Sequence, residues 1–506
     1  MSRSPHHVQP WRLARLLEAV GVAVPPGMDP LVSGLALDSR RVGPGEVFFA
    51  LAGGDGHGLH HAHQAVARGA VAVVWEPADD AAPPDAAALG VPCVAVPELR
   101  HHLGPLAARF HDHPSHGMQV AGVTGTDGKT SVCHFLATAL DTSGTPCGLM
   151  GTLGNGRPGA LDPSGLTTPD PLTVQACLAD LRGQGVRRVV MEVSSHALHQ
   201  HRVDGVEFDV ALLTHLGRDH LDYHGTPHAY GEAKARLFSW PTLKSAVLNL
   251  DDPFGARLAG RLDGRIPILG YGLSPDAAGR DQLLAREVEC LPRGLRFRVA
   301  TPWGEGVLEA GVLGRFNVYN LLAALGGLLS LDMGLSEALE RLGHAATVPG
   351  RMECFRGHGT PTLVVDYAHT PGALAQALQA AREHCTGQLW CVFGCGGGRD
   401  RGKRPLMAAA AERHADRVVL TSDNPRHEDP MAILREVCAG FSDADSVLVD
   451  PDREAAVRLA FGRAGPGDLI LVAGKGHETG QIIGGGCRPH SDRRLAAVLT
   501  QGEGGP

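Results

Sequence analysis

A glycine-rich segment at residues 122–131 combines the residue types that bind the phosphates of a nucleotide. It reads Gly-Val-Thr-Gly-Thr-Asp-Gly-Lys-Thr-Ser and contains Gly-x-x-Gly-Lys-Thr, although Val123 occupies the first glycine position of the longer phosphate-loop pattern. Backbone amides of such a loop can hold phosphates, Lys129 can reach the outer phosphates, and the Thr130 hydroxyl can bind magnesium. The spacing favours nucleotide binding over a purely structural turn.

Two polar clusters follow the next predicted strands. Glu192 opens the string Glu-Val-Ser-Ser-His, where a carboxylate can complete a magnesium site beside the phosphates. This pattern alone favours a functional cluster and a structural strand-end cluster about equally. Residues 214–225 combine many titratable groups with Leu216 and Leu221, a mixture that is rare in solvated loops, so this run favours function.

Four more clusters follow predicted strands in the last third of the chain. Within them, the guanidinium of Arg426 can fork onto a carboxylate, and Asn424 can supply an amide. Any one cluster alone is compatible with a turn, but four at successive strand ends predict a second binding face. The clusters lie at residues 366–371, 394–405, 421–426 and 473–478.

Lysine is rare in this chain, because only five of its 46 Lys and Arg residues are lysine. An ammonium group is a compact charge that can lose its proton and act as a nucleophile, whereas arginine stays protonated. Composition alone favours a surface position for Lys234. Lysines inside the polar clusters are nevertheless candidates for tasks that arginine cannot perform. The five are Lys129, Lys234, Lys244, Lys403 and Lys475.

The elements that must position these clusters alternate between short apolar runs and longer helical patterns. Such alternation predicts an α/β protein with mostly parallel sheets covered by helices. Ligands bind outside the carboxyl ends of strands in such sheets, which is where the polar clusters fall. A helix is expected at about 130–141, directly after the glycine-rich loop. Strands are expected at 119–123, 188–193, 210–214, 246–249, 362–366, 389–393, 417–421 and 469–473.

Composition limits the class of protein. A chain of 506 residues corresponds to about three domains. Its formal charge of -8 argues against broad binding to nucleic acid or to anionic membranes. The sequence has no apolar leader and no run of 18 apolar residues, so we expect a cytoplasmic chain without a membrane span. The histidine-rich tract at 57–63 is expected to be a solvated loop, with a metal site as the alternative.

Taken together, the polar strings resemble those of the Mur ligase family, which comprises ATP-dependent enzymes of peptidoglycan precursor synthesis. The resemblance extends over nearly the whole chain, and so many strings in the same order are not a plausible coincidence. The matching strings are Leu37-Asp-Ser-Arg40, Gly125-Thr-Asp-Gly-Lys-Thr130, Thr167-Thr-Pro-Asp170, Glu192-Val-Ser-Ser-His196, Arg218-Asp-His-Leu-Asp-Tyr-His224, Gly350-Arg-Met-Glu353, Asp366-Tyr-Ala-His-Thr-Pro371 and Asp423-Asn-Pro-Arg426.

The resemblance implies three α/β domains. Residues 1–112 would hold the uridine nucleotide, residues 113–348 would form a P-loop-like ATPase domain with a mostly parallel sheet, and residues 349–506 would form a Rossmann-like domain for the incoming amino acid. A monomer is expected.

The resemblance also implies an ATP site with magnesium. Lys129, Glu192, His220 and Lys234 would be catalytic, and Lys234 would be carbamylated by carbon dioxide to N6-carboxylysine. Asp127 departs from the family, which commonly has asparagine there, and adds negative charge beside the phosphates. The implied metal ligands are Thr130, Glu192, His220 and the Lys234 carbamate. The implied ATP contacts are Gly125, Thr126, Asp127, Gly128, Lys129, Thr130, Ser131, Asn317, Arg351 and Asp366.

Two further substrates follow from the resemblance: UDP-N-acetylmuramoyl-L-alanyl-D-glutamate and meso-diaminopimelate. Residues implied to contact the UDP-sugar dipeptide are Leu37, Ser39, Thr167, Thr168, Ser194, Gln200 and Arg202. Residues implied to bind diaminopimelate are Arg399, Asp423, Asn424, Pro425, Arg426, Gly474 and Glu478.

The implied reaction is an ATP-dependent ligation through an acyl phosphate, which releases ADP and phosphate. Arg426 would discriminate diaminopimelate from lysine, because only diaminopimelate has a carboxylate at its far end for the guanidinium fork. The alternatives are ligation of L-lysine or another diamino acid and, from another class, a switch protein that binds ATP without making a bond.

Overall fold

The computed structural model describes residues 10–53, 56–79, 81–276 and 279–501. None of the helices in these ranges is long and apolar enough to cross a membrane. The chain divides into two compact units, and the domain boundaries expected after residues 112 and 348 stay predictions. The first unit runs through residue 133 and includes 140–248 and 252–268; the second comprises 134–139, 249–251 and the chain from 269 onward.

The N-terminal sheet is parallel throughout, in the order β3-β4-β5-β6. Alternate residues of β4 enter opposite cores: Phe49 packs with α1 and α4, whereas Phe48 packs with α2. Because both faces are covered, the strands are short apolar runs without polar alternation. The elements are β3 (Gly34–Ala36), β4 (Glu46–Ala50), β5 (Ala72–Trp75), β6 (Cys93–Ala95), α1 (Leu13–Leu17), α2 (Ala62–Ala67) and α4 (Leu99–Phe110).

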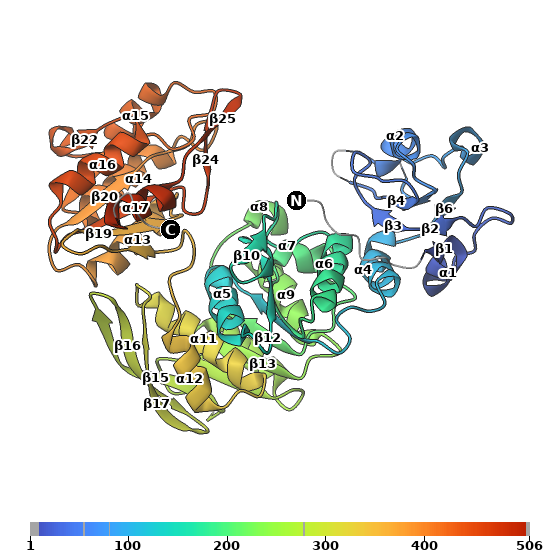
Figure 1. Ribbon diagram of the computed structural model, residues 1–506, viewed down its shortest axis with the longest axis horizontal. Coiled ribbons are helices and arrows are strands. Elements are labelled where there is room, and N and C mark those ends of the chain that lie inside the picture. The colour runs from blue at the N-terminus through green and yellow to red at the C-terminus, as the bar shows by residue number, and fades with distance from the viewer. Residues whose placement is uncertain (1–9, 54–55, 80, 277–278, 502–506) are drawn as a thin grey trace. The chain divides into compact units, whose positions relative to one another are not determined.

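Helix α4 packs against α6 (Pro171–Gly183), which belongs to the same unit (Figure 1). A Cβ atom at Gly104 in α4 would lie 1.8 Å from the carbonyl oxygen of Asp204, so only glycine permits this backbone approach. Arg182 of α6 donates to the carbonyl oxygen of Asp112 at 2.6 Å. The first unit therefore includes both the N-terminal sheet and the sheet that follows it.

In the second sheet of the first unit, β7 lies between β11 and β12, in the order β10-β9-β8-β11-β7-β12-β13. Strands β8, β11, β7, β12 and β13 are parallel, so their carboxyl ends lie along the same edge. The four predicted strands in this region are confirmed within one residue at either end. They are β7 (Gln119–Thr124), β11 (Arg188–Glu192), β12 (Val210–Leu213) and β13 (Ser245–Asn249), accompanied by β8 (Cys147–Gly151), β9 (Gly154–Arg157) and β10 (Ala160–Asp162).

The second unit begins with strands in the order β14-β15-β16-β17, of which β15, β16 and β17 are antiparallel. Leu295, Phe297 and Val299 alternate along β16 and are buried, as expected for a sheet with one covered face. Helix α12 packs on β17. The elements are β14 (Ile268–Gly272), β15 (Gln282–Leu291), β16 (Gly294–Thr301), β17 (Gly304–Ala310), α11 (Phe316–Ser330) and α12 (Leu335–Gly343).

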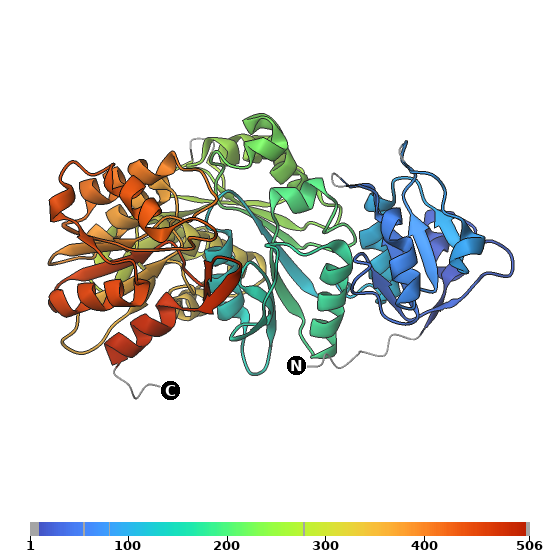
Figure 2. The same cartoon turned by 90° about the horizontal axis from the view of Figure 1, so that it is seen from above.

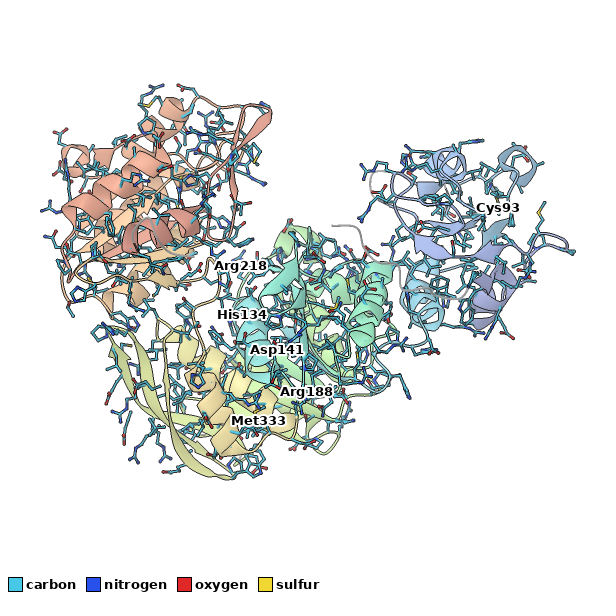
Figure 3. The ribbon with its side chains drawn as sticks, viewed as in Figure 1. Cys93, His134, Asp141, Arg188, Arg218 and Met333 are labelled. Carbon is cyan, nitrogen blue, oxygen red and sulfur yellow. The ribbon has the colours of Figure 1, made fainter. Side chains whose placement is uncertain are left out.

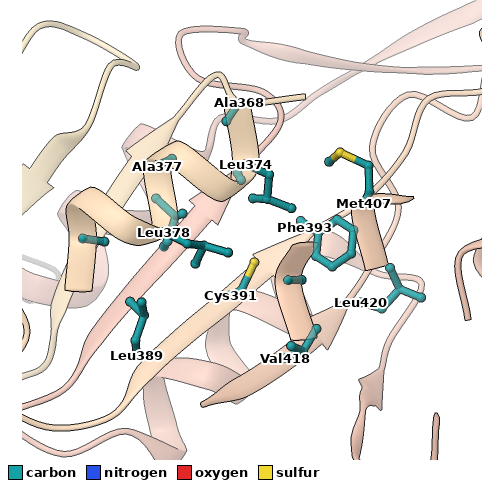
Figure 4. Close-up of a cluster of buried hydrophobic side chains, with 14 of the residues drawn as sticks. Ala368, Leu374, Ala377, Leu378, Leu389, Cys391, Phe393, Met407, Val418 and Leu420 are labelled. Carbon is teal, nitrogen blue, oxygen red and sulfur yellow. The ribbon is translucent and has the colours of Figure 1, made fainter. Parts of the chain in front are cut away.

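The C-terminal sheet is covered by helices on both faces (Figure 2). Its order is β18-β19-β23-β20-β21-β22, and every pair except β18–β19 is parallel. Leu378, Cys391 and Met407 belong to the core beneath α13, α14 and α15 (Figure 4), and the opposite core contains α16 and α17. The elements are β18 (Glu353–Phe355), β19 (Thr362–Asp366), β20 (Leu389–Phe393), β21 (Arg417–Leu420), β22 (Leu448–Val449), β23 (Leu469–Ala473), α13 (Pro371–Arg382), α14 (Lys403–His414), α15 (Pro430–Cys438), α16 (Arg453–Arg463) and α17 (Asp492–Gln501).

A buried histidine connects the two parts of the second unit. His384, just after α13, lies with Nδ1 2.6 Å from the carbonyl oxygen of Leu291, and its Nε2 accepts a hydrogen bond from the amide of Gly314 at 2.8 Å. These partners require the neutral tautomer that carries its proton on Nδ1. Ligand atoms of His384, Cys290 and Glu383 lie within 4.8 Å of one another, but both imidazole nitrogens are already engaged. A metal site is therefore not supported there.

The histidine-rich tract is helical, so the expectation of a loop is wrong, whereas the expected exposure to solvent is confirmed for His60, His61 and His63. Residues Gly58–His61 form a 3-10 helix that leads into α2. His57 is buried because its Nδ1 caps that helix by accepting from the amide of Leu59, and its Nε2 lies 2.8 Å from the carbonyl oxygen of Glu76. Both nitrogens of His57 are thus used within the fold.

Candidate functional site

The glycine-rich loop follows β7 and ends where α5 (Lys129–Leu140) begins. Gly125 has φ +145°, and a Cβ atom there would lie 1.8 Å from the Thr214 hydroxyl oxygen, so this position requires glycine. The amide of Thr126 donates to the carbonyl oxygen of His215 at 2.8 Å, and the Thr126 hydroxyl accepts from the amide of Gly217. The predicted phosphate loop is therefore held against the end of β12.

Lys129 folds back over this loop. Its Nζ donates to the carbonyl oxygens of Gly125 at 3.0 Å and of Thr126 at 2.7 Å. The ammonium group thus lies beside the backbone that the sequence predicts to hold phosphates. Gly128 has φ +83°, and its carbonyl oxygen accepts a hydrogen bond from the amide of Val132 where α5 starts.

Glu192 lies at the end of β11, the strand beside β7, and is buried. Its carboxylate accepts hydrogen bonds from the Thr130 hydroxyl at 3.0 Å and from the amide and hydroxyl of Thr152 at 2.9 and 3.1 Å. Burial raises the pKa of Glu192, although the positive charge of Lys129 and these hydrogen bonds oppose the shift. The structure thus places a carboxylate against the hydroxyl that the sequence predicts to bind magnesium.

Lys234 is buried in α9 (Pro227–Ala235), so the surface position favoured by composition is wrong. The apolar face of the helix turns inward, and Nζ donates to the carbonyl oxygen of Gly125 at 2.7 Å and lies 4.4 Å from the centre of the Tyr230 ring. Burial, and then the nearby charge of Lys129, lower the pKa of Lys234 well below its ordinary value. A lowered pKa favours the neutral amine, which is the nucleophilic form.

His220 lies at the N-terminus of α8 (Leu221–His224) with φ +51°. Its Nε2 is 3.3 Å from a carboxylate oxygen of Asp219, and its ring lies 4.7 Å from the ring of His196. Burial, and then the neighbouring His220, lower the pKa of His196 to about 4. His196 is therefore neutral near pH 7.

The residues predicted to hold the sugar and dipeptide gather beside Glu192. The Thr168 hydroxyl donates to the carbonyl oxygen of Glu192 at 2.7 Å and accepts from the amide of Ser194. Arg202 donates to the Thr168 carbonyl oxygen and, through two nitrogens, to the side-chain oxygen of Gln200. Thr167 joins the cluster through the Thr152 hydroxyl at 3.1 Å.

This polar cluster occupies one end of the parallel strands. In Figure 3, Arg218 lies in the loop after β12, whereas Arg188 lies at the start of β11, at the opposite end of the strands. Leu37 and Ser39 lie apart from it in sequence, just after β3 of the N-terminal sheet. Ser39 is buried, and its hydroxyl donates a hydrogen bond to the side-chain oxygen of Gln64 at 2.7 Å.

The second unit contains the other residues predicted to contact ATP. Asp366, at the end of β19, accepts the amides of Met352 and Ala368, both at 2.8 Å, and burial raises its pKa. The Arg351 guanidinium lies 4.9 Å from the centre of the Tyr367 ring. At the start of α11, the side chain of Asn317 donates to the carbonyl oxygen of Leu313.

Most residues predicted to bind diaminopimelate lie at the ends of β21 and β23. Lys475 is completely buried there, and its Nζ lies 2.8 Å from Glu478, 3.1 Å from the side-chain oxygen of Asn424 and 3.7 Å from Asp423. Burial tends to raise the pKa of Glu478, but hydrogen bonds from Lys475 and Asn424 outweigh it and lower the pKa. We call Asp423, Asn424, Lys475 and Glu478 the amino-acid cluster.

Arg426 borders the amino-acid cluster with φ +53°. Its Nη1 donates to the carbonyl oxygen of Gly397 at 2.8 Å, in the loop after β20 that also carries Arg399. Pro425 contributes through its backbone, because its carbonyl oxygen would lie 2.0 Å from a Cβ atom at Gly397. Gly474, the first residue after β23, has φ +116°.

A buried ion pair supports both strand ends. Arg453 and Asp492 bond through two nitrogen–oxygen pairs at 2.9 and 2.7 Å. The same guanidinium donates to the carbonyl oxygens of Ser422 and Ala473, which immediately precede Asp423 and Gly474. This fork therefore fixes the backbone on which the amino-acid cluster is built.

Comparison with known proteins agrees with this arrangement. Residues 31–111 match the Mur ligase family catalytic domain, 123–328 the Mur ligase middle domain, and 350–476 the Mur ligase glutamate ligase domain. The protein named UDP-N-acetylmuramoyl-L-alanyl-D-glutamate–2,6-diaminopimelate ligase of Alkalilimnicola ehrlichii is 54% identical over 94% of this chain and 96% of its own length. The chain belongs to the Mur ligase family.

Other Mur ligases match it over a similar length. The protein of the same name from Pseudomonas aeruginosa is 48% identical over 93% of this chain and 96% of its own length. A solved structure of a UDP-N-acetylmuramoyl-L-alanyl-D-glutamate–2,6-diaminopimelate ligase superposes with a TM-score of 0.70 at 36% identity, covering 93% of this chain and 95% of that one. The three-domain Mur ligase fold with mostly parallel sheets is therefore confirmed.

The sequence prediction for this Mur ligase missed several supporting residues. Thr152 contacts Glu192 from the end of β8, and Tyr223 bonds both His199 and the amide nitrogen of Gln200. Gln481 donates to the carbonyl oxygen of Asp423 at 2.6 Å. Thr152 directly follows an apolar run, and Tyr223 lies in the run 214–225 that the sequence singled out, whereas Gln481 is brought in by tertiary packing.

Proposed function

We propose that this Mur ligase joins meso-diaminopimelate to UDP-N-acetylmuramoyl-L-alanyl-D-glutamate with consumption of ATP. The names of its relatives pair the same dipeptide nucleotide with 2,6-diaminopimelate. The observation that supports this specificity best is the position of Arg426 beside the amino-acid cluster. The cluster offers carboxylates for an ammonium group, and Arg426 offers a guanidinium for a distal carboxylate.

The proposed reaction has two steps. The γ-carboxylate of the D-glutamyl residue attacks the terminal phosphorus of ATP, which forms an acyl phosphate and releases ADP. The amine of diaminopimelate then attacks the acyl carbon, and the tetrahedral intermediate collapses to the amide and phosphate. Both steps move negative charge, so Lys129 would act by electrostatic stabilisation at the loop, and Asp127 would work against it.

Magnesium fits the donor set at the phosphate loop. The Thr130 hydroxyl and Glu192 carboxylate are 3.0 Å apart, and both are the hard oxygen ligands that magnesium prefers. His220 would add a nitrogen ligand, and Lys234, once carbamylated, would add a further carboxylate. When bound, magnesium would neutralise charge that develops on the phosphate oxygens.

The remaining predicted contacts complete the proposal. Thr167, Thr168, Ser194, Gln200 and Arg202 would hold the sugar and dipeptide beside Glu192. Leu37 and Ser39, just after β3, would contact the uridine. Asn317, Arg351 and Asp366 in the second unit would contact the rest of ATP.

The first test uses purified protein with the dipeptide nucleotide, ATP, magnesium and meso-diaminopimelate. We expect a tripeptide nucleotide, together with phosphate release that depends on both substrates. Phosphate release at the same rate with and without the dipeptide nucleotide and diaminopimelate would instead support a switch protein and contradict the proposal.

The second test measures amino-acid selectivity with Arg426→Ala. We expect kcat/KM for meso-diaminopimelate to fall by roughly 100-fold, because the distal carboxylate loses its charged partner. Turnover of L-lysine should change little. A wild-type protein that prefers L-lysine, or a variant that keeps its preference for diaminopimelate, would contradict this assignment.

A further inference from the structure

A two-stranded hairpin borders the amino-acid cluster and has little core of its own. It consists of β24 (Gly480–Ile483) and β25 (Gly486–Pro489). β25 is exposed along its length, and Ile482 and Ile483 are 39% and 44% exposed. Isolated two-stranded hairpins are marginally stable in water, so this one depends on what it contacts.

The hairpin contacts the loop that carries the amino-acid cluster. The side chain of Gln481 is buried and donates to the carbonyl oxygen of Asp423 at 2.6 Å. The amide of Ile482 donates to the side-chain oxygen of Asn424 at 2.9 Å, and the carbonyl oxygen of Ile482 accepts the amide of Arg426 at 2.9 Å. Three consecutive contacts along β24 thus follow the loop from Asp423 to Arg426.

These contacts hold Arg426 in a conformation that an L-residue adopts at a cost. Its φ of +53° lies in the left-handed region, which is unfavourable for a residue with a side chain. The bridge between Arg426 and Ile483 offsets that cost with backbone hydrogen bonds. In this conformation the guanidinium lies over the glycine loop, where a Cβ atom at Gly396 would be 2.9 Å from Nη1.

The side-chain amide of Asn424 is largely used within the protein. Its oxygen accepts from Lys475 and from the amide of Ile482, and its nitrogen donates to Glu478. Asn424 therefore transmits the position of β24 to Lys475 and Glu478, two of the three charged members of the amino-acid cluster. A shift of the hairpin would alter the orientation of Glu478 and of Arg426 together.

We infer that the hairpin β24–β25 is the positioning element for the incoming amino acid. Gln481 and the backbone of Ile482 hold Asp423, Asn424 and Arg426 in the arrangement that receives a diamino acid with a distal carboxylate. Because the hairpin is ordered by the same loop that binds the amino acid, binding of the amino acid stabilises the hairpin. This inference rests on the proposed function.

The kinetic test compares Gln481→Leu with the wild-type protein. Loss of one buried hydrogen bond should raise KM for meso-diaminopimelate about tenfold. KM for ATP and for the dipeptide nucleotide should stay within about twofold, and kcat at saturating diaminopimelate within about threefold. Preference for meso-diaminopimelate over L-lysine should fall. Cys487→Ser, an exposed position on the same hairpin, is the matched control and should leave all five quantities unchanged.

A second measurement uses hydrogen exchange of the wild-type protein with and without meso-diaminopimelate. We expect peptides that contain Ile482 and Arg426 to exchange more slowly with the amino acid present, while peptides from the β15–β17 strands stay unchanged. The inference would be overturned by an unchanged KM for diaminopimelate in folded Gln481→Leu. It would also be overturned if the hydrogen-exchange rates of hairpin peptides were the same with and without diaminopimelate. Wild-type protein that makes no tripeptide nucleotide would overturn the proposed function instead.

Discussion

Lys234 illustrates how burial changes the chemistry of one side chain. On composition it is an ordinary surface lysine, yet its amine is enclosed beside the phosphate loop, and burial lowers its pKa. Carbon dioxide reacts only with a neutral amine, so the same burial would favour the carbamate that we propose for Lys234. Arginine cannot take this role because its guanidinium stays protonated.

Replacing Lys234 with arginine tests that role. We expect Lys234→Arg to lower turnover by roughly 100-fold or more, since the metal ligand proposed for the carbamylated lysine would be lost. Carbon-13 NMR with labelled bicarbonate should give a carbamate signal in the wild-type protein and none in the variant. Lys244→Arg is the matched control, because Lys244 pairs with Asp209 at the surface. Equal activity of both variants would contradict a special role for Lys234.

Lys475 offers a second comparison between the two cations. Its ammonium group is completely buried between Glu478, Asn424 and Asp423, and a guanidinium is larger and planar. We expect Lys475→Arg to raise KM for diaminopimelate by about tenfold while Lys244→Arg does not. Steady-state kinetics with diaminopimelate as the varied substrate measures this. If both arginine substitutions leave KM unchanged, Lys475 has no role that requires lysine, and codon usage alone would explain why lysine is rare in this chain.

The sequence predicted which residues gather, but not how their hydrogen bonds are shared. Thr130 and Glu192 meet as their positions after neighbouring strands suggest. In contrast, Asp366 accepts two backbone amides and the Asn424 amide is engaged internally. Those partners depend on tertiary packing, which residue types and spacing do not encode.

Elements with a continuous apolar run were the easiest to predict. The eight strands expected from such runs are confirmed with ends within one residue, because a parallel strand covered on both faces needs apolar residues at every position. The antiparallel strands β15–β17 and the hairpin β24–β25 were missed. Their exposed faces carry polar residues, so the alternating pattern is weak and the pairing partner decides the structure.

Helix α4 gives a prediction at the scale of elements. Because a Cβ atom at Gly104 would lie 1.8 Å from the Asp204 carbonyl oxygen, Gly104→Ala must push α4 away from the adjacent turn. We expect a loss of about 1–3 kcal/mol in the free energy of unfolding, as for other overpacked sites. Urea denaturation measures this. Gly260→Ala is the control, because a Cβ atom there would meet nothing within 4 Å, and this variant should keep the stability of the wild-type protein.

Across the whole molecule, the proposed substrates divide between two compact units. The phosphate loop belongs to the first unit and the amino-acid cluster to the second. We expect scanning calorimetry to resolve two transitions, since multi-domain chains commonly depart from two-state unfolding. The dipeptide nucleotide should raise the midpoint temperature of one transition and meso-diaminopimelate that of the other. At 100 times its Kd, each ligand should add about 2.7 kcal/mol to the free energy of unfolding of the unit that binds it. A single transition that responds equally to both ligands would contradict this division.

His384 makes the second unit sensitive to acid. Burial lowers its pKa from 6.5, although the Leu291 carbonyl and Glu383 oppose the shift and Arg356 adds to it. The unfolded chain therefore binds this proton more readily than the folded one, and stability must fall as the pH drops through 6.5 toward the lowered value. Glutamine can both donate and accept, so His384→Gln should lose less stability between pH 7 and 5 by thermal denaturation. The histidine that joins the two parts of the second unit thus also acts as a proton sensor, releasing the Gly314 amide when its Nε2 is protonated.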